Sequence, residues 1–146
     1  MNRLSMLLAA ALLFVSATAR AGHDRPIKTQ QLPAATRQFI AEYFPDQQVA
    51  LAKEERDILE LSYEVVFTNG AKAEFLRNGE WKEVDCKYGA LPGKLIPPQI
   101  AAHLSQHYPD ASAVRIERDR RKWEIELDNG LELTFDSRFN LTGIDD

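Results

Sequence analysis

The sequence predicts an α+β protein made of two tandem units, each a short helix followed by a four-stranded antiparallel meander, with the helices covering one face of the sheet. Three observations predict this fold. Motifs recur at nearly constant offsets, apolar residues recur at helical spacing, and later segments alternate apolar and polar residues. The only cysteine is Cys86, so no internal disulfide can form and the fold must depend on its apolar core.

The first 21 residues have the features of a secretory signal peptide. Arg3 precedes an apolar run from Leu4 to Val15, and Ala17, Ala19 and Ala21 provide small residues for cleavage. Cleavage after Ala21 leaves 125 residues with 16 basic and 22 acidic side chains, a net charge of −6. We therefore expect one periplasmic or secreted domain with no membrane span after cleavage, and no nucleic-acid partner.

The repeat is visible in the spacing of matched residues. Leu32-Pro33 and Phe44-Pro45-Asp46 recur 64 residues later as Ile96-Pro97 and Tyr108-Pro109-Asp110. Further along the chain the offset becomes 60, because Asn69-Gly70 matches Asn129-Gly130. The difference of four residues falls at the charged stretch 53–57, where we expect a hairpin loop. The predicted segments are a signal peptide at 1–21, a flexible start at 22–31, a first repeat at 32–87, a linker at 88–95 and a second repeat at 96–146.

Each predicted helix is bounded by prolines. Pro33 and Pro97 suit a first helical turn, and Pro45 and Pro109 disfavour the α conformation in the residue before them. Apolar or small residues recur at helical spacing between these prolines, namely Thr36, Ile40, Tyr43 and Phe44 in the first unit and Ile100, Leu104 and Tyr108 in the second. Helices of about three turns are unstable alone, so each must pack on a sheet.

The strands are predicted from alternation. Trp123, Ile125 and Leu127 alternate with Glu124 and Glu126 before the hairpin signal Asn129-Gly130, and the first unit repeats this scheme around Asn69-Gly70. The other expected strands are 49–52, 81–84, 113–117 and 141–144. Alternation places the apolar side chains under the helices and leaves the opposite face open to solvent.

The chain resembles the PepSY-like family of exported bacterial proteins, which is similar in fold to β-lactamase-inhibitor protein. The residues that carry the resemblance are Leu32-Pro33, Phe44-Pro45-Asp46, Tyr63-Glu64-Val65, Asn69-Gly70, Glu74-Phe75, Asn78-Gly79-Glu80-Trp81 and Val84-Asp85-Cys86. In the second unit Arg138-Phe139-Asn140 replaces the Asn-Gly-Glu turn. The resemblance implies a secreted α+β protein of two helix-plus-sheet repeats without a known active site. The inhibitor protein uses the open face of its sheet and its loops to bind an enzyme, and inhibition is not implied for this chain.

The open face supplies the candidate partner-binding residues. By alternation its charged side chains are Glu64, Lys72, Glu74, Arg115, Glu124, Glu126 and Glu132. Charge pairing across strands explains them without catalysis, and no cleft is expected that would raise the pKa of one carboxyl. Trp81 has two interpretations: it lies on the open face as a binding anchor, or a bulge turns it inward beside Val84.

Three further features carry weaker hypotheses. His103 and His107, four residues apart on the second helix, have a spacing that can bind a metal, but packing against the sheet is the favoured interpretation. The basic cluster 118–122 is interpreted as a solvated hairpin tip, with docking of an acidic partner as the alternative. Cys86 is expected to be a plain thiol, with a mixed disulfide as the alternative.

We therefore expect a non-enzymatic, exported binding protein without a cofactor. Its expected partner is a protein or peptide of the cell envelope, held by the open sheet face and the hairpin tips. Inhibition of an envelope enzyme such as a peptidase is the specific form that the resemblance suggests. The alternative from another class is a periplasmic protein that binds a small ligand or a metal, the latter through His103 and His107.

Overall fold

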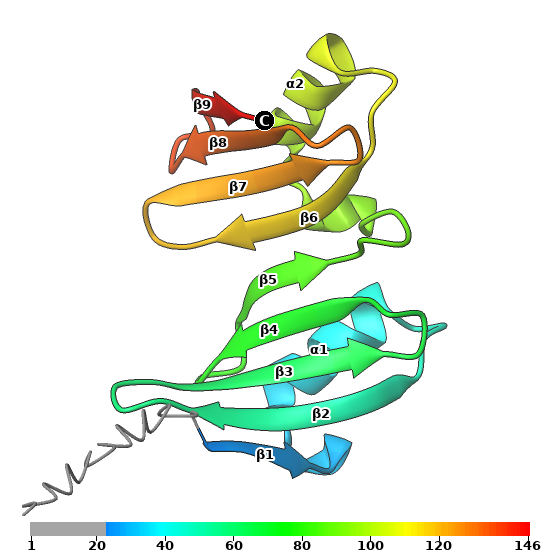
Figure 1. Ribbon diagram of the computed structural model, residues 1–146, viewed down its shortest axis with the longest axis vertical. Coiled ribbons are helices and arrows are strands. Elements are labelled where there is room, and N and C mark those ends of the chain that lie inside the picture. The colour runs from blue at the N-terminus through cyan, green and yellow to red at the C-terminus, as the bar shows by residue number, and fades with distance from the viewer. Residues whose placement is uncertain (1–22) are drawn as a thin grey trace, which may run out of the picture.

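A nine-stranded antiparallel sheet, with its strands in chain order from β1 to β9, forms the body of the molecule (Figure 1). The computed structural model describes residues 23–146, so the predicted signal peptide lies outside the described residues. No helix within 23–146 is both long and apolar enough to cross a membrane. The strands are β1 (His23–Ile27), β2 (Val49–Arg56), β3 (Leu61–Phe67), β4 (Lys72–Leu76), β5 (Trp81–Asp85), β6 (Ala113–Arg118), β7 (Lys122–Leu127), β8 (Glu132–Asp136) and β9 (Leu141–Asp145).

Two helices cover the same face of this sheet. The helix α1 (Ala34–Tyr43) follows Pro33, and α2 (Pro98–His107) follows Pro97, as the prolines predict. Phe39 of α1 packs edge-on against Phe75 of β4, and His103 of α2 packs edge-on against Phe135 of β8. Two short 3-10 helices, η1 (Thr29–Gln31) and η2 (Gly93–Leu95), precede them. Each α-helix is followed by four strands, and both connect neighbouring antiparallel strands (Figure 1).

The sheet is continuous across the middle of the molecule. Strands β5 and β6 pair through three residue pairs, with Val84 opposite Ile116 at the centre. The Cys86 amide adds a hydrogen bond of 2.7 Å to the Val114 carbonyl. The whole described chain therefore shares one sheet, although its two parts are joined by a short ladder.

A row of apolar residues in cross-strand register forms the centre of the core. From β2 to β8 its members are fully or almost fully buried: Ala52, Val65, Ala73, Val84, Ile116, Ile125 and Leu133. These residues alternate with charged neighbours on the opposite face. The predicted two-sided sheet, with one apolar face under the helices and one polar face, is therefore what the fold contains.

Two sequence-based expectations about local structure are wrong. The segment 22–31, expected to be flexible, contains β1 and η1, because residues 23–27 pair along their whole length with Arg56 to Ala52 of β2. The charged stretch expected as a loop continues β2 as far as Arg56, since Lys53 and its neighbours pair with both β1 and β3. The hairpin tip is residues 57–60, where Leu59 is 95% exposed.

The linker 88–95 is partly built into the core. Leu91 and Leu95 are buried, and the Leu91 amide donates to the Ala113 carbonyl. The turn at Gly79 is similarly fixed by packing on α1. Its φ of 89° is in the left-handed region, a Cβ there would lie 2.8 Å from that of Pro33, and its carbonyl accepts a hydrogen bond from the buried Thr36 hydroxyl.

Candidate functional site

Five glutamates lie in one cross-strand row on the face of the sheet that the helices leave open. Each is directly opposite the next, from β3 to β7, and we call them the glutamate row: Glu64, Glu74, Glu83, Glu117 and Glu124. Like charges directly opposite each other destabilise a sheet. Stability of the sheet alone therefore does not explain why five glutamates lie in this row.

Three cations offset part of this repulsion. Lys53 lies at one end of the row, 3.5 Å from Glu64 and 2.8 Å from Glu55. Arg115 pairs with Glu83 at 2.8 Å and with Glu117 at 2.6 Å, and these carboxylates raise its pKa above the ordinary arginine value. Hydrogen bonding to Glu55 likewise raises the pKa of Lys53. Lys122 pairs with Glu124 at 2.5 Å.

Glu74, at the centre of the first half of the row, has no such partner. No basic nitrogen among residues 23–146 comes within ion-pair distance of its carboxylate. Partial burial, and next the charge of Glu83, raise the pKa of Glu74 above the ordinary glutamate value, and the charge of Lys82, outside ion-pair distance, opposes part of this rise. An acid with glutamates on both sides and no cation of its own is a place where an external positive charge is favoured.

The other predicted open-face residues lie where alternation placed them. Lys72 is exposed and opposite Asp85, and Arg115 is opposite both Asp85 and Glu126. Glu126 is also opposite Glu132, whose carboxylate is 3.8 Å from Arg115. Together with Asp85, these four residues form a second row beside the glutamate row, on the same face.

Trp81 lies on the other face. A bulge between Glu74 and Phe75 lets Trp81 pair with Phe75, so its ring points to the helix side and packs against Phe39 and Trp123. Of the two interpretations of the sequence, the inward bulge is the one that the structure contains. Trp81 is therefore not part of the open face.

Four residues of these arrangements were not among the predicted site residues: Glu83, Glu117, Lys53 and Arg118. Glu83 was hidden because the bulge breaks the alternation of β5, and Glu117 is two residues beyond Arg115 on the same face, which alternation could have revealed. Arg118, assigned to the solvated tip, is instead half-buried, and its guanidinium carbon lies 3.9 Å from the centre of the Trp81 ring. No local pattern signals that contact, since the residues are 37 apart.

Of the histidine pair, His103 packs against the sheet as favoured, whereas His107 is exposed. The rings of His103 and His107 are 4.4 Å apart, and His103 also lies edge-on to Phe135. Burial, and next the neighbouring His107, lower the pKa of His103. Within residues 23–146 no three histidine, cysteine or carboxylate side chains are grouped so as to hold a metal ion.

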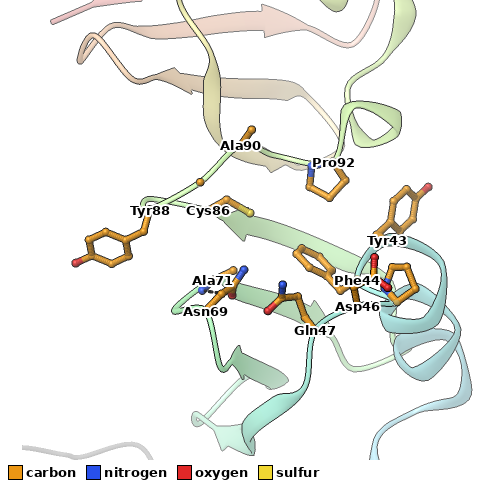
Figure 2. Close-up of a pocket in the computed structure, with 12 residues that line it drawn as sticks. Tyr43, Phe44, Asp46, Gln47, Asn69, Ala71, Cys86, Tyr88, Ala90 and Pro92 are labelled. Atoms are coloured by element: carbon orange, nitrogen blue, oxygen red, sulfur yellow. Dashed lines mark hydrogen bonds between the residues drawn. The ribbon is translucent and has the colours of Figure 1, made fainter.

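Cys86 faces a cavity of about 320 Å³ between the end of α1, the β3–β4 turn and the linker (Figure 2). Phe44 and Gln47 line it from one side, and Ala90 and Pro92 from the other. The thiol is buried, and burial raises its pKa to about 11, so it is protonated at neutral pH. A protonated, buried thiol is a poor nucleophile, which argues against the mixed-disulfide hypothesis.

Comparisons with known proteins agree with this architecture. Residues 61–143 match the family model described as "Putative beta-lactamase-inhibitor-like, PepSY-like". Among curated proteins, none matches the chain.

Solved structures give a closer likeness. A "putative periplasmic protein from DUF2874 family" of Bacteroides vulgatus is 46% identical, with a TM-score of 0.83 over 86% of this chain and 99% of that one. A "putative calcium-regulated periplasmic protein" of Bacteroides thetaiotaomicron is 49% identical, with a TM-score of 0.83 over 84% and 97%. The expected periplasmic or secreted location is thereby confirmed. The family is not one of known enzymes.

Proposed function

We propose that this chain, which belongs to the PepSY-like family, is a binding protein of the cell envelope that docks a positively charged protein or peptide surface on its open sheet face. The glutamate row is the single observation that carries the proposal. Its five carboxylates repel one another in the free protein, and a cationic partner would remove that cost on binding.

The charge of the whole open face supports the same partner chemistry. Around the row the face adds Glu55, Asp85, Glu126, Glu132 and Asp145, against the basic residues Lys53, Lys72, Arg115 and Lys122. A face with such an excess of one sign attracts a partner of the other sign from a distance and orients it. The predicted binding residues stay in this proposal except for Trp81.

We infer that the protein acts without catalysis. The carboxylates of the row lie on an open sheet and not in a cleft, and a hydrolase of the acid–base type needs a site that separates the pKa values of two acids. Inhibition of an envelope peptidase or other enzyme is the specific form suggested by the relatives of inhibitor-like description.

We also infer that residues 32–87 and 96–146 are two copies of one unit. The support is that each contains one α-helix followed by four strands, and that Glu64 and Glu124 occupy matching strand positions on the same face. The glutamate row then runs through both copies and their junction.

The proposal is tested by binding to an envelope extract. The protein from residue 23 onwards, immobilised by its C-terminus, is expected to retain a partner that is released by about 0.5 M salt, because exposed charges are screened at that ionic strength. In a titration with the purified partner, the double variant Glu74→Gln/Glu83→Gln is expected to bind with an affinity at least tenfold lower than that of the parent.

The matched control removes the same charge from the helix side. Glu42→Gln/Asp110→Asn changes two exposed acids beside the ends of α1 and α2 and should leave affinity within twofold of the parent. Equal losses in both double variants would show a general effect of net charge and would exclude a site on the open face.

A second candidate function is binding of a divalent cation. The observation that favours it is Glu74, an acid between Glu64 and Glu83 without an ion-pair partner in the described part of the chain, and one solved relative carries the description calcium-regulated. Because no three metal-ligating side chains are grouped within residues 23–146, this binding would be a loose association with the acidic face and not coordination at a formed site. About 1 mM calcium should then raise the melting temperature of the parent but not of Glu74→Gln. Equal melting curves of the parent with and without calcium would exclude this function.

A further inference from the structure

The end of the β5–β6 ladder contains a second feature, on the helix side of the sheet. Beyond the pair Glu83–Glu117 the two strands no longer pair with each other. Arg118 of β6 reaches across this opening, and its Nε donates a hydrogen bond of 3.0 Å to the Trp81 carbonyl of β5. The Trp81 carbonyl has no backbone partner on β6 at this point and accepts a hydrogen bond from a side chain instead.

The guanidinium of Arg118 lies close to both tryptophans of the protein and stacks on Trp81. Its central carbon is 3.9 Å from the Trp81 ring centre and 5.8 Å from that of Trp123, and the rings are themselves edge to face. We call these three residues the Trp–Arg cluster. Stacking on indole orients the guanidinium and shields it from water on that side.

The charge of Arg118 has no counterion among residues 23–146. Its recorded hydrogen bond uses Nε and ends on a neutral carbonyl, and no carboxylate oxygen lies within ion-pair distance. Burial lowers the pKa of Arg118, and the more distant charge of Glu80 opposes that effect. A half-buried cation without an anion is unfavourable, so a ligand that brings one is favoured.

The cluster lines a hollow of about 520 Å³, a size that accommodates a small molecule or a few residues of peptide. Its other charged lining residues are Lys82, Arg120, Glu60, Glu80 and Asp119. The Asp119 carboxylate already accepts hydrogen bonds from the backbone N–H groups of Arg121 and Lys122. The indole rings and Leu76 supply the apolar part of the wall.

We propose that this hollow binds a carboxylate joined to an apolar group, with the two terminal nitrogens of Arg118 holding the carboxylate and the indole rings holding the apolar part. Two sources share this chemistry: the C-terminus of a peptide that ends in an apolar residue, and a free aliphatic acid. The site is separate from the glutamate row, and either proposal can fail without the other.

Tryptophan fluorescence tests the proposal directly, since both tryptophans line the hollow and the chain has no others. The probes are N-acetyl-Ala-Ala-Leu with a free carboxylate, the same peptide as its C-terminal amide, and octanoate. A saturable change with the acid peptide, at least tenfold weaker with the amide, identifies a peptide terminus. The same saturation with octanoate alone identifies a free aliphatic acid. Either result supports the site.

Variants separate recognition by Arg118 from simple apolar contact. Arg118→Gln should weaken binding of the effective acid at least tenfold, whereas Arg37→Gln, at an exposed arginine of α1 outside the hollow, should change it less than twofold. Equal binding of acid and amide by the unaltered protein would overturn the proposal and needs no variant. Absence of any saturable change with all three probes would overturn it as well.

Discussion

On the inference that residues 32–87 and 96–146 are two copies of one unit, the two halves of the molecule place matching residues in different surroundings. Val84 of β5 and Ile144 of β9 are the apolar residues of the corresponding last strands, 60 residues apart. Val84 is completely buried because β6 pairs beside it, whereas Ile144 is 50% exposed because β9 is the edge of the sheet. Burial of these side chains therefore depends on whether a further strand pairs beside them and not on the type of residue.

The helices differ in the same way. Phe39 and Tyr43 of α1 correspond to His103 and His107 of α2, 64 residues later. Phe39 is buried against Phe75 and Phe44, whereas His103 is only partly buried and His107 is exposed. The first half therefore holds an aromatic core under its helix, and the second half has smaller and more polar contacts there.

The open face also differs between the halves. Glu74 of β4 corresponds to Thr134 of β8, which is opposite Glu124 and Gly143. The like-charge contacts around Glu74 thus have no counterpart at the matching position of the second half, where Glu132, opposite Glu126 and Asp145, instead takes the place of Lys72.

The largest expected effect comes from the helix comparison. Phe39→Ala removes an aromatic ring from the buried contacts with Phe75 and Phe44 and should lower the free energy of unfolding by about 3–5 kcal/mol. His103→Ala, at the matching position, should cost about 1 kcal/mol or less, because that ring is partly solvated. Urea unfolding of both variants measures this difference, and equal costs would contradict it.

The edge comparison predicts a smaller difference. Val84→Ala should lower the free energy of unfolding by about 2 kcal/mol, from two lost methyl groups and the cavity they leave. Ile144→Ala removes more atoms but should cost only about 1 kcal/mol, since half of that side chain is already in water. If β9 paired with a strand of a second molecule, Ile144 would be buried and the order of the two costs would reverse. Sedimentation, which measures the oligomeric state, is therefore the control.

The smallest expected effect concerns charge. At pH about 7.5, Glu74→Gln should raise the free energy of unfolding by about 0.5 kcal/mol, a small gain because the acid is half exposed and its repulsion is screened. The pKa of Glu74 is raised in the folded state, so the folded chain takes up the proton before the unfolded chain does. The parent should therefore gain stability relative to the variant as pH falls toward about 5.

Chemical denaturation at the two pH values measures the change. If the difference in the free energy of unfolding between variant and parent grows as the pH falls, Glu74 is favourably paired in the folded state. That result would contradict the description of the row. Thr134→Gln is the matched control in the second half and should show no such dependence on pH, because neither residue ionises in this range.

The sequence alone determined most of the local structure. Prolines located both α-helices, alternation assigned the open-face residues, and Asn69-Gly70 and Asn129-Gly130 located two hairpin turns, each with its glycine at positive φ. These features depend on residues close together in the chain, and stereochemistry acts on them directly. The family and the periplasmic location also followed from patterns in the sequence.

Only the tertiary structure decided which distant residues meet. Pairing of residues 23–27 with β2 made a strand of a segment with no apolar alternation, and the bulge in β4–β5 turned Trp81 toward the helices. The five glutamates became one row, and Arg118 met two tryptophans, only once β5 had paired with β6. The physical reason is that register and edges depend on the neighbouring strand, which a short stretch of sequence does not specify.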